Sequence, residues 1–155
     1  MSSPAPFSIE HRIPWSDVDF ARIVYFPRFF SYFEMAELEW YRHQGLVYED
    51  VLAGLAIWMP RVAAHCNYRA PAHLAELVSI EMHLARLGRT SYTFGFEAFR
   101  LPERTRLADG QIAIATVDRE TFRPTPIPGK LLSLLDGLSR KPESQNPESP
   151  NNDEP

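Results

Sequence analysis

The stretch WSDVDFARIVYFPRFFSYF, residues 15–33, decides the fold of this chain. Two aspartates come first, and a run of aromatic side chains then continues past Pro27. Proline is favoured in the first turn of a helix, and a glycine such as Gly45 is typical of a helix end. The stretch therefore predicts a long helix between these two residues, with an apolar face that forms the centre of the core. That face is expected to hold Phe29, Tyr32, Phe33, Ala36 and Trp40, with Ser31, Glu34 and Arg42 opposite.

The rest of the chain has the pattern of strands joined by short connections. Apolar and polar residues alternate over Phe7–Ile13, which is typical of a half-buried strand. Short connections favour an antiparallel sheet, because a parallel pair of strands needs a crossover. The expected fold class is α+β, with one sheet against one helix in a single domain over residues 1–141. The other expected elements are a helical turn or loop at 45–55, strands at 57–68, 76–86, 90–99 and 111–121, a turn at Asp109-Gly110, and a short helix at 130–138.

The acidic charge of the chain is concentrated at its C-terminus. The 155 residues include 20 acidic and 16 basic side chains, for a formal charge of −4. Residues 142–155 hold four of the acidic residues, four prolines and no basic residue, so we expect a disordered acidic tail. The remainder is balanced in charge, and a balanced domain has no general attraction for nucleic acid.

Several other classes of protein and site are excluded by composition. No apolar run approaches the roughly 20 residues needed to span a bilayer, and the N-terminus lacks a secretory signal. We therefore expect a cytoplasmic protein without a membrane partner. The single cysteine, Cys66, rules out an intrachain disulfide and a cysteine-based metal site. Asp17, Asp19 and the nearby His11 form too weak a ligand pattern to predict a metal.

The joint between the aspartates and the helix has the residues needed for acyl chemistry. The amides of Phe26, Arg28 and Phe29 lie at the positive end of the expected helix, which favours an oxygen that gains negative charge. Asp19 lies on a loop that must fold back near this turn, where it could attack an acyl group or activate water. The structural alternative is that the aspartate caps a turn or the helix N-terminus.

The motif at residues 15–36 resembles the opening of hotdog-fold acyl-CoA thioesterases of the 4-hydroxybenzoyl-CoA thioesterase family. The similarity continues through MPRVAAHCNYRAPAHLAELVSI (59–80), ARLGRTSYTF (85–94) and PTPIP (124–128), and covers roughly residues 7–135. The resemblance implies a curved antiparallel sheet wrapped around one long central helix. It also implies a homodimer or homotetramer with active sites at the subunit interface.

The resemblance implies roles for particular residues. Asp19 corresponds to the catalytic carboxylate, as nucleophile or general base, and the backbone N–H of Phe26 corresponds to the oxyanion donor. Asp17 corresponds to a supporting position that orders the loop. Arg22 is a departure, because it occupies a position where the family favours glycine.

The substrate contacts follow from the same resemblance. We expect Tyr25 and Trp58 to line the acyl slot, and Met59 to make it apolar where related enzymes have a polar residue. Arg86 and Arg89 lie on a strand-to-strand turn that usually binds the CoA nucleotide, and arginine suits phosphate because its planar fork bonds two oxygens.

The expected function is hydrolysis of an aromatic or other compact acyl-CoA to the free acid and CoA. No cofactor is implied, because a thioester is already an activated acyl group, and CoA enters as part of the substrate. The alternatives are an acyl-carrier-protein thioesterase and a non-catalytic acyl-CoA-binding module. Glu37 is the alternative catalytic carboxylate, because other hotdog branches place theirs on the long helix, although we prefer a structural role for it. His65 and Cys66 are expected to be structural.

Overall fold

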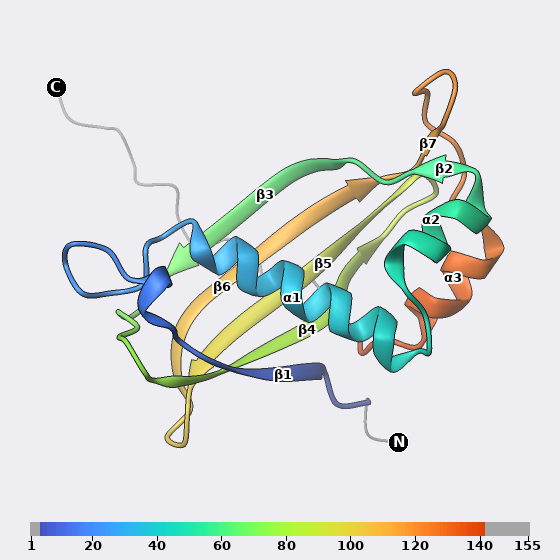
Figure 1. Cartoon of the computed structure of the whole chain (residues 1–155). Helices are drawn as coiled ribbons and strands as arrows, with labels where there is room; N and C mark the ends of the chain where they lie inside the picture. The colour runs from blue at the N-terminus through green and yellow to red at the C-terminus, as the bar shows by residue number, and fades with distance from the viewer. Residues whose placement is uncertain (1–3, 142–155) are drawn as a thin grey trace, which may run out of the picture.

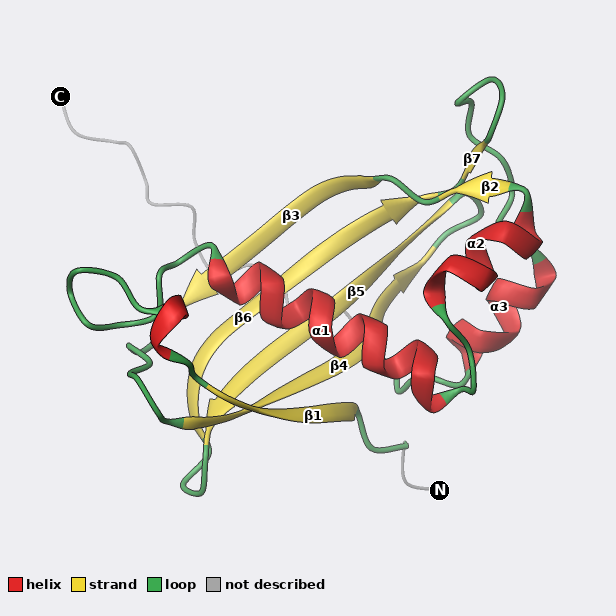
Figure 2. Ribbon diagram, in the orientation of Figure 1, coloured by secondary structure: helices red, strands yellow, loops and turns green. Residues whose placement is uncertain are grey.

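A curved antiparallel sheet wraps around one long helix in the computed structural model, which describes residues 4–141 (Figures 1 and 2). The sheet has five strands in the order β1-β4-β5-β6-β3, and β2 and β7 form a separate two-stranded ribbon. This arrangement confirms the α+β fold and the hotdog architecture that the resemblance implied. The tail expected to be disordered, residues 142–155, lies outside the described residues. The elements are β1 (Phe7–Arg12), η1 (Trp15–Asp17), α1 (Arg28–His43), α2 (Tyr48–Leu55), β2 (Ile57–Trp58), β3 (Arg61–Tyr68), β4 (Leu77–Leu87), β5 (Ser91–Arg100), β6 (Thr105–Ala115), β7 (Val117–Asp118) and α3 (Gly129–Asp136).

Helix α1 lies along the concave face of the sheet and buries the apolar face that its sequence predicts (Figure 1). Its aromatic side chains pack on those of β5: the ring of Phe33 stacks on Phe96 with centroids 4.7 Å apart, and Trp40 meets Phe94 edge to face. Ser31, Glu34 and Arg42, which were expected on the opposite face, are exposed. The helix begins directly after Pro27, and Gly45 follows its end with a φ of 76°.

The strand pairing supplies the other half of the core. Tyr92, Phe94, Phe96 and Ala98 of β5 are buried, as the alternation in the sequence predicts, but Gly95, Glu97 and Phe99 between and beyond them are buried too, so both faces of this central strand are covered. The ladders β4–β5, β5–β6 and β3–β6 each contain one register irregularity, and such bulges bend strands locally. No helix in the described part of the chain has the length and apolar character required to cross a membrane.

The prediction of a turn at Asp109-Gly110 is wrong. Both residues lie inside β6, and the connection from β5 is the turn at residues 101–104. Asp109 is in the strand because its carboxylate accepts hydrogen bonds from Asn67 and Arg69 across the sheet. Gly110 is there because a Cβ would lie 2.5 Å from the carbonyl oxygen of His65. Close packing and an ion pair, rather than a turn, explain this dipeptide.

Two of the expected strands are each divided in the structure. The segment 57–68 forms β2 and β3, which belong to different sheets, and Pro60 separates them. Proline has no N–H to contribute to a ladder, which explains the break. The segment 111–121 likewise contains the end of β6 and then β7, which pairs with β2. This ribbon holds Trp58 at one end of the molecule (Figure 1).

Candidate functional site

The loop between η1 and α1 folds back on itself as a small hairpin. Val18 pairs with Val24, and the N–H of Asp19 donates to the carbonyl of Ile23 over 2.9 Å. The hairpin needs a left-handed residue near its tip, and Arg22 takes that conformation with a φ of 65°. This explains why a glycine would suit the position. The hairpin places Asp19 beside Ile23, three residues before Phe26.

The carboxylate of Asp19 is half-buried and uses one oxygen to order its own loop. Its Oδ1 accepts the N–H of Ala21 over 2.8 Å, which is the side-chain-to-backbone contact of an Asx turn. Within residues 4–141 its other oxygen, Oδ2, has no hydrogen-bond donor. Asp19 therefore does stabilise a turn, as the structural alternative predicts, and its second carboxylate oxygen accepts no hydrogen bond from the described residues.

Asp17 fastens the loop to the body of α1. Its side chain is nearly buried, at 12% exposure, and Oδ2 accepts the hydroxyl of Tyr32 over 2.9 Å. Its backbone carbonyl accepts the N–H of Tyr25 over 2.8 Å. Burial, followed by the hydrogen bond to Asp17, raises the pKa of Tyr32, so the phenol remains a protonated donor. The Arg28 guanidinium lies 3.7 Å from the same carboxylate, and His11 lies 3.9 Å from it.

The start of α1 offers one open amide rather than the three that the sequence suggests. The N–H groups of Arg28 and Phe29 donate to the carbonyls of Tyr25 and Phe26 in a tight first turn. The N–H of Phe26 donates to no group in the described part of the chain, and Pro27 provides no side-chain cap. The Phe26 carbonyl accepts the hydroxyl of Tyr68, at the end of β3, over 2.9 Å. The open amide and Asp19 therefore belong to one loop-and-helix joint.

Two of the three residues expected to contact the acyl group, Trp58 and Met59, lie at the other end of the sheet from Tyr25. Trp58 is 39% exposed, with the Arg119 guanidinium 4.5 Å from its ring centroid, and Met59 is buried. Arg61, the first residue of β3, donates to the Met59 carbonyl, whereas Tyr68 at the end of β3 contacts the start of α1. A strand of this length spans about 23 Å at roughly 3.3 Å per residue.

Arg86 and Arg89 lie at the same end as Trp58. Arg86 lies near the end of β4 and Arg89 lies in the turn between β4 and β5, where its carbonyl accepts the N–H of Ile127 beside the β2–β7 ribbon. Both side chains are exposed and form no ion pair with residues 4–141. The predicted site residues therefore form two groups in one chain: Asp19, Phe26 and Tyr25 at one end, and Trp58, Met59 and the two arginines at the other.

Glu37, the alternative carboxylate, is buried in the core. Its Oε1 accepts the Arg61 guanidinium over 2.5 Å, and Arg61 also donates to the hydroxyl of Tyr48. Burial raises the pKa of Glu37, and the charge of Arg61 opposes that effect. His65 is exposed on β3, and burial raises the pKa of the Cys66 thiol to about 11, which keeps it out of the reactive thiolate form.

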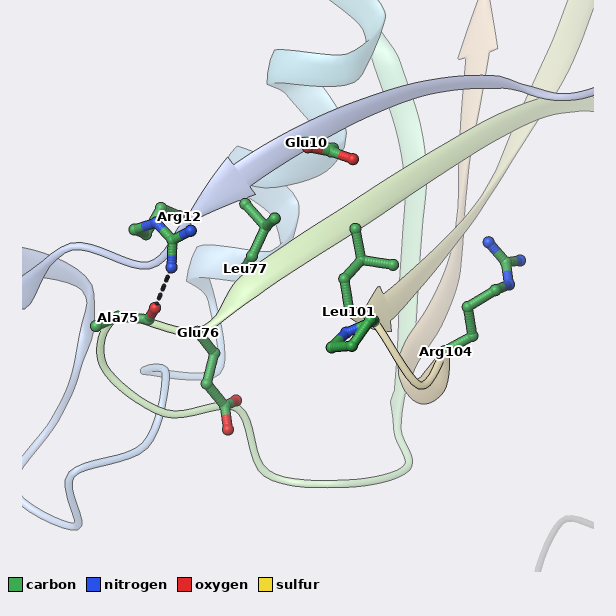
Figure 3. A pocket seen from close by; sticks show the side chains of 8 residues that line it. Glu10, Arg12, Ala75, Glu76, Leu77, Leu101 and Arg104 are labelled. Carbon is green, nitrogen blue, oxygen red and sulfur yellow. Dashed lines mark hydrogen bonds between the residues drawn. The ribbon is translucent and has the colours of Figure 1, made fainter.

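A pocket of about 690 Å³ lies elsewhere, beside the edge strand β1 (Figure 3). Leu77 and Leu101 contribute apolar surface to it, and Arg12 at its rim donates to the Ala75 carbonyl over 2.7 Å. None of the predicted site residues lines this pocket. Within residues 4–141 no cluster of three or more potential metal ligands occurs.

Sequence reasoning missed the side chains that hold the site together. Tyr32 was identified as a core residue, but its hydroxyl has a polar role on Asp17 that the helical pattern does not reveal. Tyr68 and Arg61 connect β3 to α1 at opposite ends of the strand, and neither has a local sequence signal. Their partners are 42 and 24 residues away, so only the pairing of β3 in the sheet places them.

Comparisons with known proteins agree with this architecture. A family model described as the thioesterase-like superfamily matches residues 13–135. Acyl-CoA thioester hydrolase YbgC of Escherichia coli O6:H1 is 23% identical over 122 residues, covering 79% of this chain and 90% of that protein.

Solved structures of thioesterases share the fold. Slr0204, a 1,4-dihydroxy-2-naphthoyl-CoA thioesterase from Synechocystis, matches with a TM-score of 0.79 at 20% identity over 85% of this chain and 96% of its own. The gentisyl-coenzyme A thioesterase BH1999 matches with a TM-score of 0.69 at 22% identity over 81% of this chain and 98% of its own. At these identities the structural matches establish the fold alone.

Proposed function

The chain belongs to the thioesterase-like superfamily, and from that membership we propose that it hydrolyses acyl-CoA thioesters to the free acid and CoA. The observation that carries the proposal is the joint at α1, where the open Phe26 amide and the open oxygen of Asp19 belong to one short loop. YbgC, a relative over most of both chains, is named for this activity.

Each group of the joint has a chemical role in the proposed reaction. Asp19 attacks the thioester carbonyl to form an anhydride that water then hydrolyses, or it takes a proton from the water that attacks directly; in both routes the C–S bond breaks and CoA leaves as the thiol. The carbonyl oxygen gains negative charge and accepts the N–H of Phe26 at the positive end of α1. A preorganised donor of this kind contributes roughly 3–4 kcal/mol to transition-state stabilisation. Asp17, through Tyr32 and the Tyr25 amide, holds this loop in place.

A second copy of the chain completes the site in this proposal. β3 is a free edge of the sheet, and its first five residues are exposed, with Val62 at 61%. Native proteins usually protect or cover free edges of this length, and two-fold dimers are the commonest oligomers. Antiparallel pairing of two β3 strands places Arg61 of the partner subunit beside Tyr68. Because Tyr68 contacts Phe26, Trp58 and Met59 of the partner subunit then approach the Asp19 joint.

The same pairing supports a compact acyl group and a CoA carrier. Tyr25 and Phe26 are about half exposed in one chain, and Trp58 of the partner subunit would face them across an apolar slot. Such a slot suits an aromatic or other compact acyl group. Arg86 and Arg89 of the partner subunit have no counter-ion among the described residues and would bind the phosphates of CoA. No cofactor is required, since the thioester is already activated.

The test is release of free thiol from benzoyl-CoA, phenylacetyl-CoA and a series of aliphatic acyl-CoAs. Asp19→Asn is the informative variant, because asparagine also forms Asx turns and so retains the Ala21 contact while losing the charge. We expect the variant to fold and to lose activity by about 100-fold or more. Asp136→Asn, which removes a charge on the exposed surface of α3, is the matched control and should remain active.

Two results would contradict the proposal. Undiminished hydrolysis by Asp19→Asn would show that the catalytic carboxylate is another residue, such as Glu37. If the native protein hydrolysed no CoA ester, the proposed reaction would be wrong, and acyl-carrier-protein thioesters and then simple acyl-CoA binding would be measured instead.

A further inference from the structure

The last described residues of the chain pair with the edge of β4. β1 pairs with β4 only as far as Met82, so the edge of β4 beyond that residue is left for another segment. Arg140 occupies it in a parallel bridge with Leu84. The N–H of Leu84 donates to the Ser139 carbonyl over 2.9 Å, and the N–H of Lys141 donates to the Leu84 carbonyl over 3.2 Å. The end of the described chain is therefore fixed beside β4.

The parallel pairing sets the direction in which the chain leaves the domain. Residues 139–141 run the same way as β4, so the chain points along that strand toward the turn that follows it. Arg86 lies two residues beyond Leu84, about 7 Å along a strand, and Arg89 lies in the turn itself. The buried side chain of Leu138 anchors the segment just before it pairs with β4. The exit of the chain is thus aimed at the two arginines.

The cations of the exit segment are already paired, whereas the two arginines beyond it are not. Lys141 donates to the carboxylate of Glu97 over 2.7 Å, and Arg140 forms an ion pair with an aspartate one helical turn earlier. Arg86 and Arg89 are exposed and form no ion pair with residues 4–141. Residues 142–155 hold four acidic side chains and no basic one. The acidic segment therefore starts next to two uncompensated positive charges.

We propose that the acidic C-terminal segment, residues 142–155, binds Arg86 and Arg89 of its own chain and competes there with the phosphates of CoA. The inference rests on the proposed function, in which these two arginines bind those phosphates. Carboxylates and phosphates both bond the planar guanidinium through two oxygens, so they compete for the same donors. The segment thereby lowers the apparent affinity of the protein for acyl-CoA.

Tethering makes this contact effective although each ion pair is weak. An exposed pair of this kind contributes little on its own. A segment attached next to its target has an effective concentration in the millimolar range, and residues 142–155 span about 20 Å even as a coil, which is enough to reach both arginines. At about 1 mM, a contact with a dissociation constant of about 0.5 mM raises KM about threefold. The value of kcat should not change, because saturating substrate displaces the segment.

The experiment measures KM and kcat in whole-chain variants of matched charge, with the acyl-CoA that the native protein hydrolyses fastest. The test variant carries amides in place of the four acidic residues of the segment: Glu143→Gln, Glu148→Gln, Asp153→Asn and Glu154→Gln. The control removes the same charge from exposed residues elsewhere: Glu10→Gln, Glu34→Gln, Glu49→Gln and Glu103→Gln. We expect KM to fall about threefold in the test variant and to stay unchanged in the control, with equal kcat in all three proteins.

Three further measurements locate the competition. The corresponding acyl-pantetheine thioester lacks the nucleotide phosphates, so its KM should be the same in the native protein and the test variant. With Arg86→Gln and Arg89→Gln present, KM for acyl-CoA should rise, and removing the acidic charges should then have no effect. At roughly 0.5 M salt the Debye length falls to about 4 Å, and the KM values of the native protein and the test variant should become equal.

The outcomes separate this inference from the proposed function. Equal KM values in the native protein and the test variant, with acyl-CoA hydrolysed by both, would overturn the inference alone. A fall in KM that the control shares would also overturn it, because net charge would then be responsible. The same holds for a fall that persists with acyl-pantetheine, which has no nucleotide phosphates to compete with. Absence of hydrolysis of every CoA ester by the native protein would overturn both.

Discussion

The ion pair between Glu37 and Arg61 determines how stability should depend on pH. The Glu37 side chain is only 3% exposed, and the single cation paired with it in the described part of the chain is Arg61. Replacing Arg61 by leucine leaves a buried, unpaired carboxylate, and breaking a buried pair in this way costs about 3–5 kcal/mol. Because the Arg61 side chain is 36% exposed and water can partly replace it, we expect a loss of about 3 kcal/mol at neutral pH.

The sign of the pH dependence follows from burial. Burial raises the folded-state pKa of Glu37, and in the variant Arg61 no longer opposes that effect. A carboxyl whose pKa is raised on folding favours the folded state at low pH and loses that contribution as the pH rises through the folded pKa. The difference in free energy of unfolding between the native protein and Arg61→Leu should therefore be small at pH 5 and reach about 3 kcal/mol at pH 8.

Thermal unfolding at fixed protein concentration measures this gap. For a chain of this size, about 3 kcal/mol corresponds to a fall in Tm of roughly 6–12 °C. Arg42→Leu is the matched control, because it breaks an exposed pair with Glu39 on the same helix and should cost at most about 1 kcal/mol. Adding Glu37→Gln to Arg61→Leu should abolish the pH dependence. An equal loss of Tm at pH 5 and pH 8, or a loss no greater than that of Arg42→Leu, would refute the reasoning.

Two further predictions concern backbone positions. Gly110→Ala should lower stability by about 1–3 kcal/mol, because the new Cβ would lie 2.5 Å from the His65 carbonyl oxygen and 2.7 Å from the Phe33 ring. Gly129→Ala, where nothing lies within 4 Å, is its control, and equal Tm values for the two variants would contradict the packing argument. Arg22→Gly should raise stability by up to about 1 kcal/mol in urea unfolding, because it removes a left-handed arginine. A decrease would show that the Arg22 side chain makes a stabilising contact.

The parts of the fold that could be predicted are those with a strong local period. The long helix, the alternating strand through Tyr92 and Phe94, and the antiparallel order all follow from spacing and short connections. The prediction of a turn at Asp109-Gly110 is wrong because the contacts that hold this dipeptide in β6 involve residues more than 40 positions away. Local turn statistics cannot represent a close approach between two distant strands.

The candidate site was predictable only in its local half. Asp19 and Phe26 are seven residues apart, and the loop chemistry and the resemblance both pointed to them. The contact between the Met59 sulfur and the Tyr92 hydroxyl could not be predicted, because these residues are 33 positions apart and meet only in the folded domain. The separation of the two groups along β3 also follows from strand order, which the sequence pattern left open.

Because the two groups of residues lie at opposite ends of β3, the proposed activity should depend on protein concentration. In the proposed dimer each chain would carry two half-sites, neither of them complete alone, so the number of working sites would depend on dimer concentration and fall steeply on dilution below the dissociation constant. The same geometry permits complementation between defective chains. A chain altered at Asp19 paired with a chain altered at Trp58 would contain one site with both lesions and one with neither. Two inactive proteins could thus regain activity on mixing, with the intact sites confined to the mixed dimers.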